Sequence, residues 1–350
     1  GRKMSKQLGN SPELLGLIDK YGADAIRFGI LISSPAGNDL LFDVKEESTL
    51  KQGSFFINKL WNAMKLVKIW EGRIENNKEQ EAEEFAVQWF QQRLHESKAE
   101  IESLFAQFKL SEALKAIYTL IWDDFCSWYL EWIKPGYEEA MSKSVYDKTV
   151  FFFDELLQIL HPFMPFVTEE IYHELKDRNE GDDICVKQQS PAETYDNAVI
   201  EKGRLLKNII TLLRDARNKS QLKPKDAIEL YVQSSDSAKF TGITDILKKQ
   251  VNAISISGTS ESIANAIIVT VEKDIFYIIT NKEIDTVSVI AELEKELLYQ
   301  QNFLQSVEKK LGNERFVQNA KPEVVVFERK KQADAQARIT TIQESLKNLQ

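Results

Sequence analysis

The spacing of apolar residues changes twice along this 350-residue chain, and these changes constrain its fold more than any other feature. From about 46 to 220, apolar residues recur at helical intervals, as Phe56, Leu60 and Met64 illustrate. Prolines and glycines divide this part into segments. The pattern predicts a helical bundle. Its helices are expected at about 46–71, 85–108, 110–141, 145–160, 166–176 and 198–220.

The spacing then becomes that of strands. Residues 228–232 alternate between apolar and polar side chains, and three β-branched runs follow at 253–257, 266–271 and 275–280. A helical stretch is expected at about 237–250. We therefore predict a small mixed α/β unit over 226–283.

The last 67 residues carry heptads. Gly312 and Asn313 end one helical run, and Pro322 can start the next. Each run is short for a long parallel coiled coil, so an antiparallel coiled-coil hairpin over 284–350 fits better. The fold class is mainly α. By themselves, such heptads also fit a coiled-coil scaffold that dimerises.

Composition excludes several classes of protein. The chain is 43% apolar and 28% charged, as expected of a globular protein, and its apolar runs are too short to span a bilayer. Cys126 and Cys185 are too few and too far apart for a zinc site, and free thiols of a cytoplasmic protein are expected. His95, His161 and His173 show no metal-ligand spacing, so we predict no metal site.

The formal charge of −9 argues against a general nucleic-acid binder, but one segment reverses it. Between Lys202 and Lys225 lie eight basic residues and one acid, Asp215. Such a segment can bind phosphates locally while the acidic remainder repels nonspecific contacts. The candidate RNA contacts here are Lys202, Arg214, Arg217, Lys219 and Lys223.

Two lysines flank one serine at the start of the chain, in Lys3-Met4-Ser5-Lys6. Mobile ammonium groups on a short loop suit a polyphosphate. The segment resembles the Lys-Met-Ser-Lys-Ser signature of class I aminoacyl-tRNA synthetases, with Gln7 in place of the last serine. The stretch from Tyr21 to Phe28 stands where these enzymes carry a "Tyr-Gly-Ala-Asp-Ala-Leu-Arg" helix.

Three further stretches narrow this resemblance to the valyl-tRNA synthetase family. Residues 122–131 resemble its anticodon-domain signature, with Ser127 in place of the usual Asp. Residues 160–172 resemble a stretch shared by the valyl, isoleucyl and leucyl enzymes. Residues 310–325 resemble the hairpin tip of the valyl C-terminal coiled coil. The resemblance covers almost the whole chain and is weakest over 226–283.

The resemblance implies ATP-dependent attachment of valine to tRNA-Val by the full-length enzyme, with Mg²⁺ accompanying ATP. Lys3 and Lys6 would act on the leaving phosphates, with Met4 and Ser5 also at the ATP site. The implied parts are the end of the class I catalytic domain at 1–45, an anticodon-binding helical bundle at 46–225, the α/β unit at 226–283 and a tRNA-binding arm at 284–350. Candidate contacts of the arm with the tRNA elbow are Arg315, Lys321, Arg329 and Lys330.

Gly1 and Arg2 leave no strand or helix ahead of the phosphate loop, so we expect the C-terminal part of a longer, monomeric cytoplasmic protein. The adenine motif, the valine pocket and the editing domain would lie upstream, and the chain by itself is expected to be inactive. The alternatives are a stand-alone tRNA- or RNA-binding module and the coiled-coil scaffold.

Overall fold

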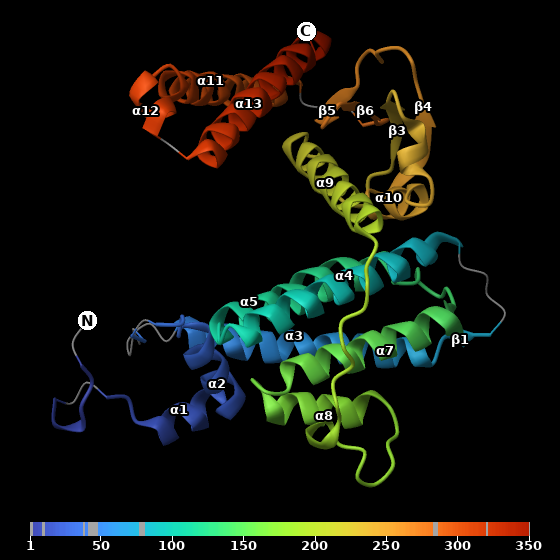
Figure 1. Ribbon diagram of the computed structural model, residues 1–350. Coiled ribbons are helices and arrows are strands. Elements are labelled where there is room, and N and C mark those ends of the chain that lie inside the picture. Colours follow the sequence, from blue (N-terminus) through green and yellow to red (C-terminus); the bar gives the residue numbers. More distant parts are fainter. Residues whose placement is uncertain are drawn as a thin grey trace. The chain divides into compact units, whose positions relative to one another are not determined.

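The computed structural model describes residues 3–8, 11–37, 39–40, 48–76, 81–282, 286–319 and 321–349. The chain forms two compact units, Gly1–Gly203 and Arg204–Gln350. Helices dominate both (Figure 1), which confirms the predicted fold class. The division lies within helix α9, Asn197–Lys219. The boundaries predicted between functional parts, after residues 45, 225 and 283, stay predictions.

The first unit begins with a 3₁₀ turn, η1 (Lys6–Leu8), and the helices α1 (Leu14–Tyr21) and α2 (Ala23–Ile32). Gly22 separates these helices at φ 84°, a left-handed conformation that glycine adopts without strain. Helix α3 (Ser48–Glu71) packs closely on α2. A Cβ atom on Gly53 would lie 2.8 Å from the carbonyl oxygen of Ala25, so glycine is needed where these two helices cross.

The remaining helices complete the predicted bundle, except that the helix expected over 110–141 ends at Ile133, ahead of Pro135. They are α4 (Glu81–Ala106), α5 (Leu110–Thr119), a π-helix η2 (Leu120–Tyr129), α6 (Leu130–Ile133), α7 (Lys143–Leu160) and α8 (Pro165–Leu175). Short strands β1 (Ile74–Glu75) and β2 (Met141–Ser142) pair in parallel. Aromatic side chains fill the core, where the ring centroids of Trp89 and Trp132 lie 4.6 Å apart and those of Phe90 and Tyr129 lie 4.9 Å apart.

A long connection joins α8 to α9 and holds only the short helix η3 (Ile184–Val186). The buried ammonium of Lys98 on α4 bonds to Glu155 on α7 and, at 2.9 Å, to the carbonyl oxygen of Ser190 in the connection. The Ser190 hydroxyl also donates to Glu155 at 2.7 Å. Because a buried ammonium needs such partners, this pairing fixes the connection across the bundle.

The second unit contains the predicted α/β unit. Its sheet has the order β4-β3-β6-β5, with β3 and β4 parallel and the other neighbours antiparallel. The strands are β3 (Ile228–Gln233), β4 (Ala253–Gly258), β5 (Ile267–Val271) and β6 (Asp274–Ile279). The helices η4 (Ser237–Phe240) and α10 (Thr244–Gln250) form the crossover that parallel strands require.

Helices α11 (Thr286–Leu311) and α13 (Pro322–Leu349) form the predicted antiparallel hairpin, with α12 (Glu314–Asn319) between them (Figure 1). Near the turn Lys310 lies 3.9 Å from Glu328, and farther from it Arg338 bonds to Glu296 at 2.6 Å. A residue late in α11 thus contacts one early in α13, and a residue early in α11 contacts one later in α13, so the helices are antiparallel. Val307, Ala335, Ile339 and Ile342 are buried.

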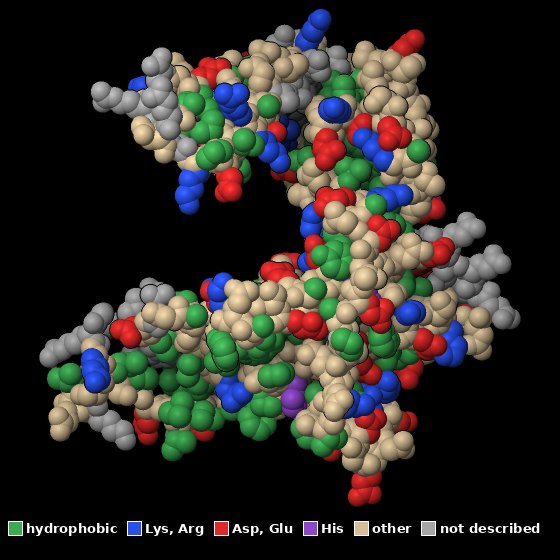
Figure 2. Space-filling view, in the orientation of Figure 1, with side chains coloured by type: hydrophobic (Ala, Val, Ile, Leu, Met, Phe, Trp, Pro, Cys, Tyr) green, Lys and Arg blue, Asp and Glu red, His purple; other side chains and the backbone are tan. Residues whose placement is uncertain are grey.

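Apolar side chains also reach the surface of the first unit. Figure 2 shows hydrophobic side chains gathered over α1 and α2, and Leu14 and Leu15 on α1 are 54% and 69% exposed. Among the described residues, no helix combines the length and the apolar character that a membrane crossing requires.

Candidate nucleic-acid interface

The N-terminal loop forms a single turn. The backbone N–H of Leu8 donates to both the hydroxyl and the carbonyl oxygen of Ser5, each at 3.2 Å. Ser5 is half-buried, whereas Lys3 and Met4 are exposed. The side chain of Lys6 lies outside the described residues. The serine of the motif therefore closes the turn, with one of its lysines at the surface beside it.

Two of the stretches singled out from the sequence bind each other. Asp24 on α2 accepts hydrogen bonds from the N–H groups of Val167 (2.6 Å) and Phe166 (3.4 Å) at the start of α8. These donors have no partner within their own helix, so Asp24 caps α8 from a distant part of the chain. Arg27 donates to the carbonyl oxygens of Phe163 (3.0 Å) and Pro162 (2.9 Å).

Asp24 is only 4% exposed, and its burial raises the pKa of its carboxyl group despite the hydrogen bonds from Val167 and Phe166. These hydrogen bonds join helix α2, in the N-terminal segment that carries the phosphate-loop motif, to the helical bundle.

The stretch 122–131, which resembles the anticodon-domain signature, is mainly core. Asp124 is buried and accepts from Arg93 Nη2 at 2.9 Å. Burial disfavours the charged guanidinium of Arg93, but Asp124 and Glu96 outweigh this and raise its pKa. Burial also raises the pKa of the Cys126 thiol to about 12, so this cysteine is unreactive at neutral pH. Ser127 donates to the carbonyl oxygen of Trp122, five residues earlier, at 2.8 Å.

The basic segment at 202–225 is partly bound into the fold. Arg217 is buried and donates to the carbonyl oxygens of Val251, Lys223 and Asp226. Burial lowers its pKa from the ordinary value. Its first role in the structure is to hold the turn at 223–226, and its RNA contact stays a prediction.

The other predicted residues of this segment lie nearer the surface. Arg214 is exposed and donates to Gln250, with its Nη2 2.7 Å from the side-chain oxygen. Lys219 lies 2.8 Å from Glu296 and 3.1 Å from Asp215. Lys223 is exposed, and Lys202 places its ammonium 5.7 Å from the ring centre of Phe85. A pocket of about 270 Å³ opens beside Arg214, Arg217 and Asn218.

The hairpin presents Lys321, Arg329 and Lys330 as exposed side chains. The side chain of Arg315 lies outside the described residues. Lys331 is tied to its own helix, with its ammonium 2.9 Å from Glu328 and 4.5 Å from the ring centre of Phe327. The exposed cations therefore lie immediately before α13 and in its first half.

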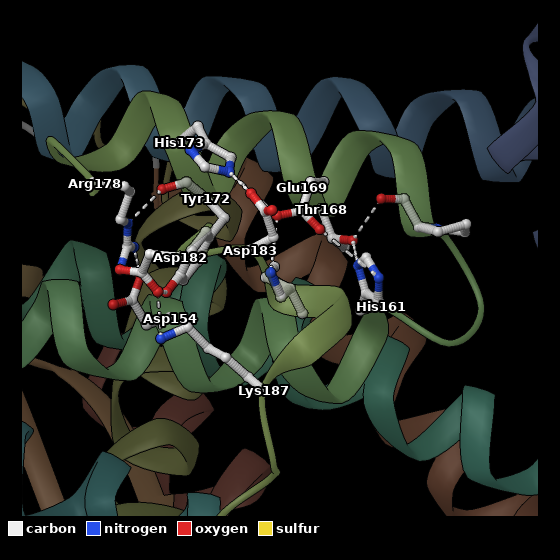
Figure 3. A network of polar contacts seen from close by, with 12 residues as sticks. Asp154, His161, Thr168, Glu169, Tyr172, His173, Arg178, Asp182, Asp183 and Lys187 are labelled. Atoms are coloured by element: carbon white, nitrogen blue, oxygen red, sulfur yellow. Dashed lines mark hydrogen bonds and ion pairs between the residues drawn. The ribbon is translucent and has the colours of Figure 1, made fainter. Parts of the chain in front are cut away.

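The sequence did not predict one cluster of histidine and carboxylate side chains. An open pocket of about 540 Å³ is lined by His161, Glu169, His173 and Cys185, and Figure 3 labels the first three of these. The sequence signal was the i, i+4 spacing of Glu169 and His173 on a helix. Only the folded connection after α8 brings Asp183 to them.

The comparisons with known proteins agree with this arrangement. The family described as "tRNA synthetases class I (I, L, M and V)" matches residues 1–43, the "Anticodon-binding domain of tRNA ligase" matches 87–232, and the "Valyl tRNA synthetase tRNA binding arm" matches 285–350. The valine–tRNA ligase of Parabacteroides distasonis is 42% identical over 99% of this chain. The chain belongs to the valyl-tRNA synthetase family.

Other valyl-tRNA synthetases match over a similar extent. The enzyme of Porphyromonas gingivalis is 42% identical over 100% of this chain, and that of Streptococcus pyogenes serotype M3 is 34% identical. The chain spans 39% of the length of the first of these and 41% of the second. A crystal structure described as the ternary complex of Agrobacterium radiobacter K84 agnB2 LeuRS-tRNA-LeuAMS covers 57% of the chain, with a TM-score of 0.39 and 16% identity, a likeness too weak to bear on the fold.

Proposed function

We propose that this chain is the part of a valine–tRNA ligase that binds tRNA-Val and carries the ATP-phosphate loop. One observation carries the proposal. Matches to a class I catalytic segment, an anticodon-binding domain and a valyl tRNA-binding arm follow one another along a single chain. A generic RNA-binding module or a scaffold has no reason to combine all three.

The reaction is the joining of valine to tRNA-Val at the expense of ATP. The carboxylate of valine attacks the α-phosphorus of ATP and pyrophosphate leaves, taking the electron pair of the broken P–O bond. A hydroxyl at the 3′ end of tRNA-Val then attacks the valyl carbonyl and releases AMP. Mg²⁺ enters with ATP as part of the substrate.

Lys3 and Lys6 stabilise the negative charge that develops on the departing phosphates. An ammonium placed there lowers the barrier because it binds the transition state more strongly than the ground state. Met4 and Ser5 shape the loop, and the hydrogen bonds of Ser5 to Leu8 support this role. The exposure of Lys3 supports its access to a phosphate.

The bundle reads the anticodon and the hairpin holds the tRNA elbow. Bases of a single-stranded loop are read by stacking and by edge contacts, whereas a folded elbow is gripped through phosphates and shape. The proposed contacts are Lys202, Arg214, Arg217, Lys219 and Lys223 on the basic segment and Arg315, Lys321, Arg329 and Lys330 on the hairpin. The protein works as a monomer in the cytoplasm.

The deciding experiment is binding of this chain to purified tRNA-Val and to a non-cognate tRNA over a series of salt concentrations. We expect tighter binding of tRNA-Val, and we expect anticodon substitutions to remove that preference. Equal and purely salt-dependent binding would leave a generic RNA-binding module. Dimerisation without RNA binding would favour the scaffold.

A further inference from the structure

We propose that Glu169, His173 and Asp183, with His161 beside them, form a binding site for a divalent transition-metal ion of the zinc class. Glu169 and His173 come from α8, and Asp183 comes from the connection that follows it (Figure 3). His161 stands at the end of α7. His161, Glu169 and His173 line the open pocket described above, and none of the four residues is among those proposed to bind ATP or tRNA.

The ligand atoms have the spacing that one metal ion requires. Nε2 of His173 lies 3.3 Å from Oε1 of Glu169 and 2.9 Å from Oδ1 of Asp183. Two ligands about 2.0–2.2 Å from a tetrahedral zinc ion lie roughly 3.3–3.6 Å from each other. The two contacts of His173 are thus close to the separation of coordinating atoms, and the exposed side chains of His173 and Asp183 can adjust to an ion.

The atoms that lie within 4.8 Å of one another belong to Glu169, His173 and Asp183, and His161 stands beside this group with its tautomer fixed by Thr168. The Thr168 hydroxyl donates to the carbonyl oxygen of Met164 at 2.8 Å, so it accepts from Nδ1 of His161, also at 2.8 Å. With the proton on Nδ1, the lone pair of neutral His161 is on Nε2. That atom lies 3.9 Å from Oε2 of Glu169, beyond hydrogen-bonding distance.

Surrounding groups already hold these ligands in place. The N–H of Ile184 donates to Oε1 of Glu169 at 2.9 Å, which fastens the connection to α8 next to Asp183. Such outer contacts orient a ligand before the metal arrives. Two imidazoles and two carboxylates suit zinc, whereas calcium and magnesium prefer oxygen ligands alone.

The test is titration of the full chain with Zn²⁺ against a chromophoric chelator. We expect one Zn²⁺ per chain, and we expect His173→Gln and Asp183→Asn each to weaken its affinity at least tenfold. His95→Gln is the matched control. His95 also faces a carboxylate, with Nε2 3.9 Å from Glu193, but it belongs to no such cluster among the described residues.

A second measurement separates lost ligands from lost folding. Zn²⁺ should raise the thermal unfolding midpoint of the wild-type chain and of His95→Gln, because a ligand that binds only the folded state stabilises it. It should leave the midpoint of His173→Gln unchanged, although that variant unfolds cooperatively without metal. Zinc affinity equal in the wild type and in His173→Gln would overturn the proposal, as would the absence of zinc binding by the wild type.

Discussion

At the scale of single residues, Asp24 shows how two stretches far apart in sequence become one structural feature. Its carboxylate accepts the first free N–H groups of α8, 142 and 143 residues farther along the chain. An unpaired buried N–H costs about 1–3 kcal/mol. The stability of the junction therefore depends on one buried carboxylate, and the neighbouring Arg27 completes the junction from the same helix.

We predict that Asp24→Ala destabilises the chain by about 1–3 kcal/mol, because it leaves the N–H groups of Phe166 and Val167 without an acceptor. Asp24→Asn should cost less, since its amide oxygen can still accept. Urea unfolding gives both values. Asp19→Ala, at an exposed position on α1, is the control and should change little. Equal losses in all three variants would contradict the capping role.

The difference in stability between the wild type and Asp24→Asn should also depend on pH. Burial raises the pKa of Asp24, so its contribution to stability is greatest below the ordinary value of 3.8 and declines as the pH rises through the folded-state pKa. The wild type should therefore lose stability relative to Asp24→Asn across that window, and the difference should be constant at higher pH.

These residue-level roles were only partly predictable. The motif at 3–6 could be recognised from its lysines because their spacing is local. Arg217 was equally conspicuous as a basic residue, yet nothing in its neighbours indicates that it is buried against Val251 and the 223–226 turn. The burial of Arg217 depends on the α/β unit that follows it in the chain, and it cannot be inferred from the charge of the side chain.

At the scale of elements, the crossing of α2 and α3 depends on a glycine. We predict that Gly53→Ala destabilises by about 1–3 kcal/mol, because its Cβ would lie 2.8 Å from the backbone oxygen of Ala25, which cannot move aside cheaply. Gly16→Ala on α1 is the matched control. Nothing lies within 4 Å of a Cβ there, so this change should stabilise by up to about 1 kcal/mol.

The midpoints of urea unfolding of Gly53→Ala and Gly16→Ala test this prediction. Opposite shifts would confirm that Gly53 is required by close packing. A stabilised Gly53→Ala would mean that the two helices can separate without cost.

The hairpin is joined to α9 by Glu296, which lies between Lys219 (2.8 Å) and Arg338 (2.6 Å). Burial raises the pKa of Glu296, but its two partners outweigh this and lower it below the ordinary 4.5. Its stabilisation is thus present above pH 4.5 and lost as the pH falls through the folded-state pKa.

Glu296→Gln should accordingly destabilise by roughly 1 kcal/mol at neutral pH, and the difference from the wild type should shrink in acid. Thermal unfolding over a pH series measures it. Glu294→Gln, at an exposed position on the same helix, should follow the wild type throughout. A difference that persists unchanged into acid would count against the ion pairs.

Most elements were predictable because apolar spacing reports them directly. The spacing of apolar residues indicates the strands at 228–233 and 253–258 and the two long hairpin helices. The π-helix at Leu120–Tyr129 was not predictable, because its i, i+5 pairing has no residue signature of its own. The metal-ligand cluster also escaped, since it forms only when the connection after α8 folds back.

At the scale of the whole molecule, charge is distributed unevenly. The chain carries −9 in total, yet exposed cations gather on the 202–225 segment and on α13. Acidic surroundings disfavour nonspecific binding of polyanions, so we expect phosphates to bind only where the cations gather. This distribution supports the proposed selective binding of one tRNA.

The proposed contact of the hairpin with the tRNA elbow can be tested through its salt dependence. We predict that Arg329→Ala and Lys330→Ala each weaken tRNA binding and reduce the slope of log K against log salt by about 1, because each removes one phosphate contact. The loss should be the same for tRNA-Val and a non-cognate tRNA, since phosphates carry no sequence information. Lys148→Ala, an exposed lysine on α7, should leave both affinity and slope unchanged. A loss confined to tRNA-Val would instead make α13 a reader of tRNA identity, and an unchanged slope would remove the hairpin from the RNA interface.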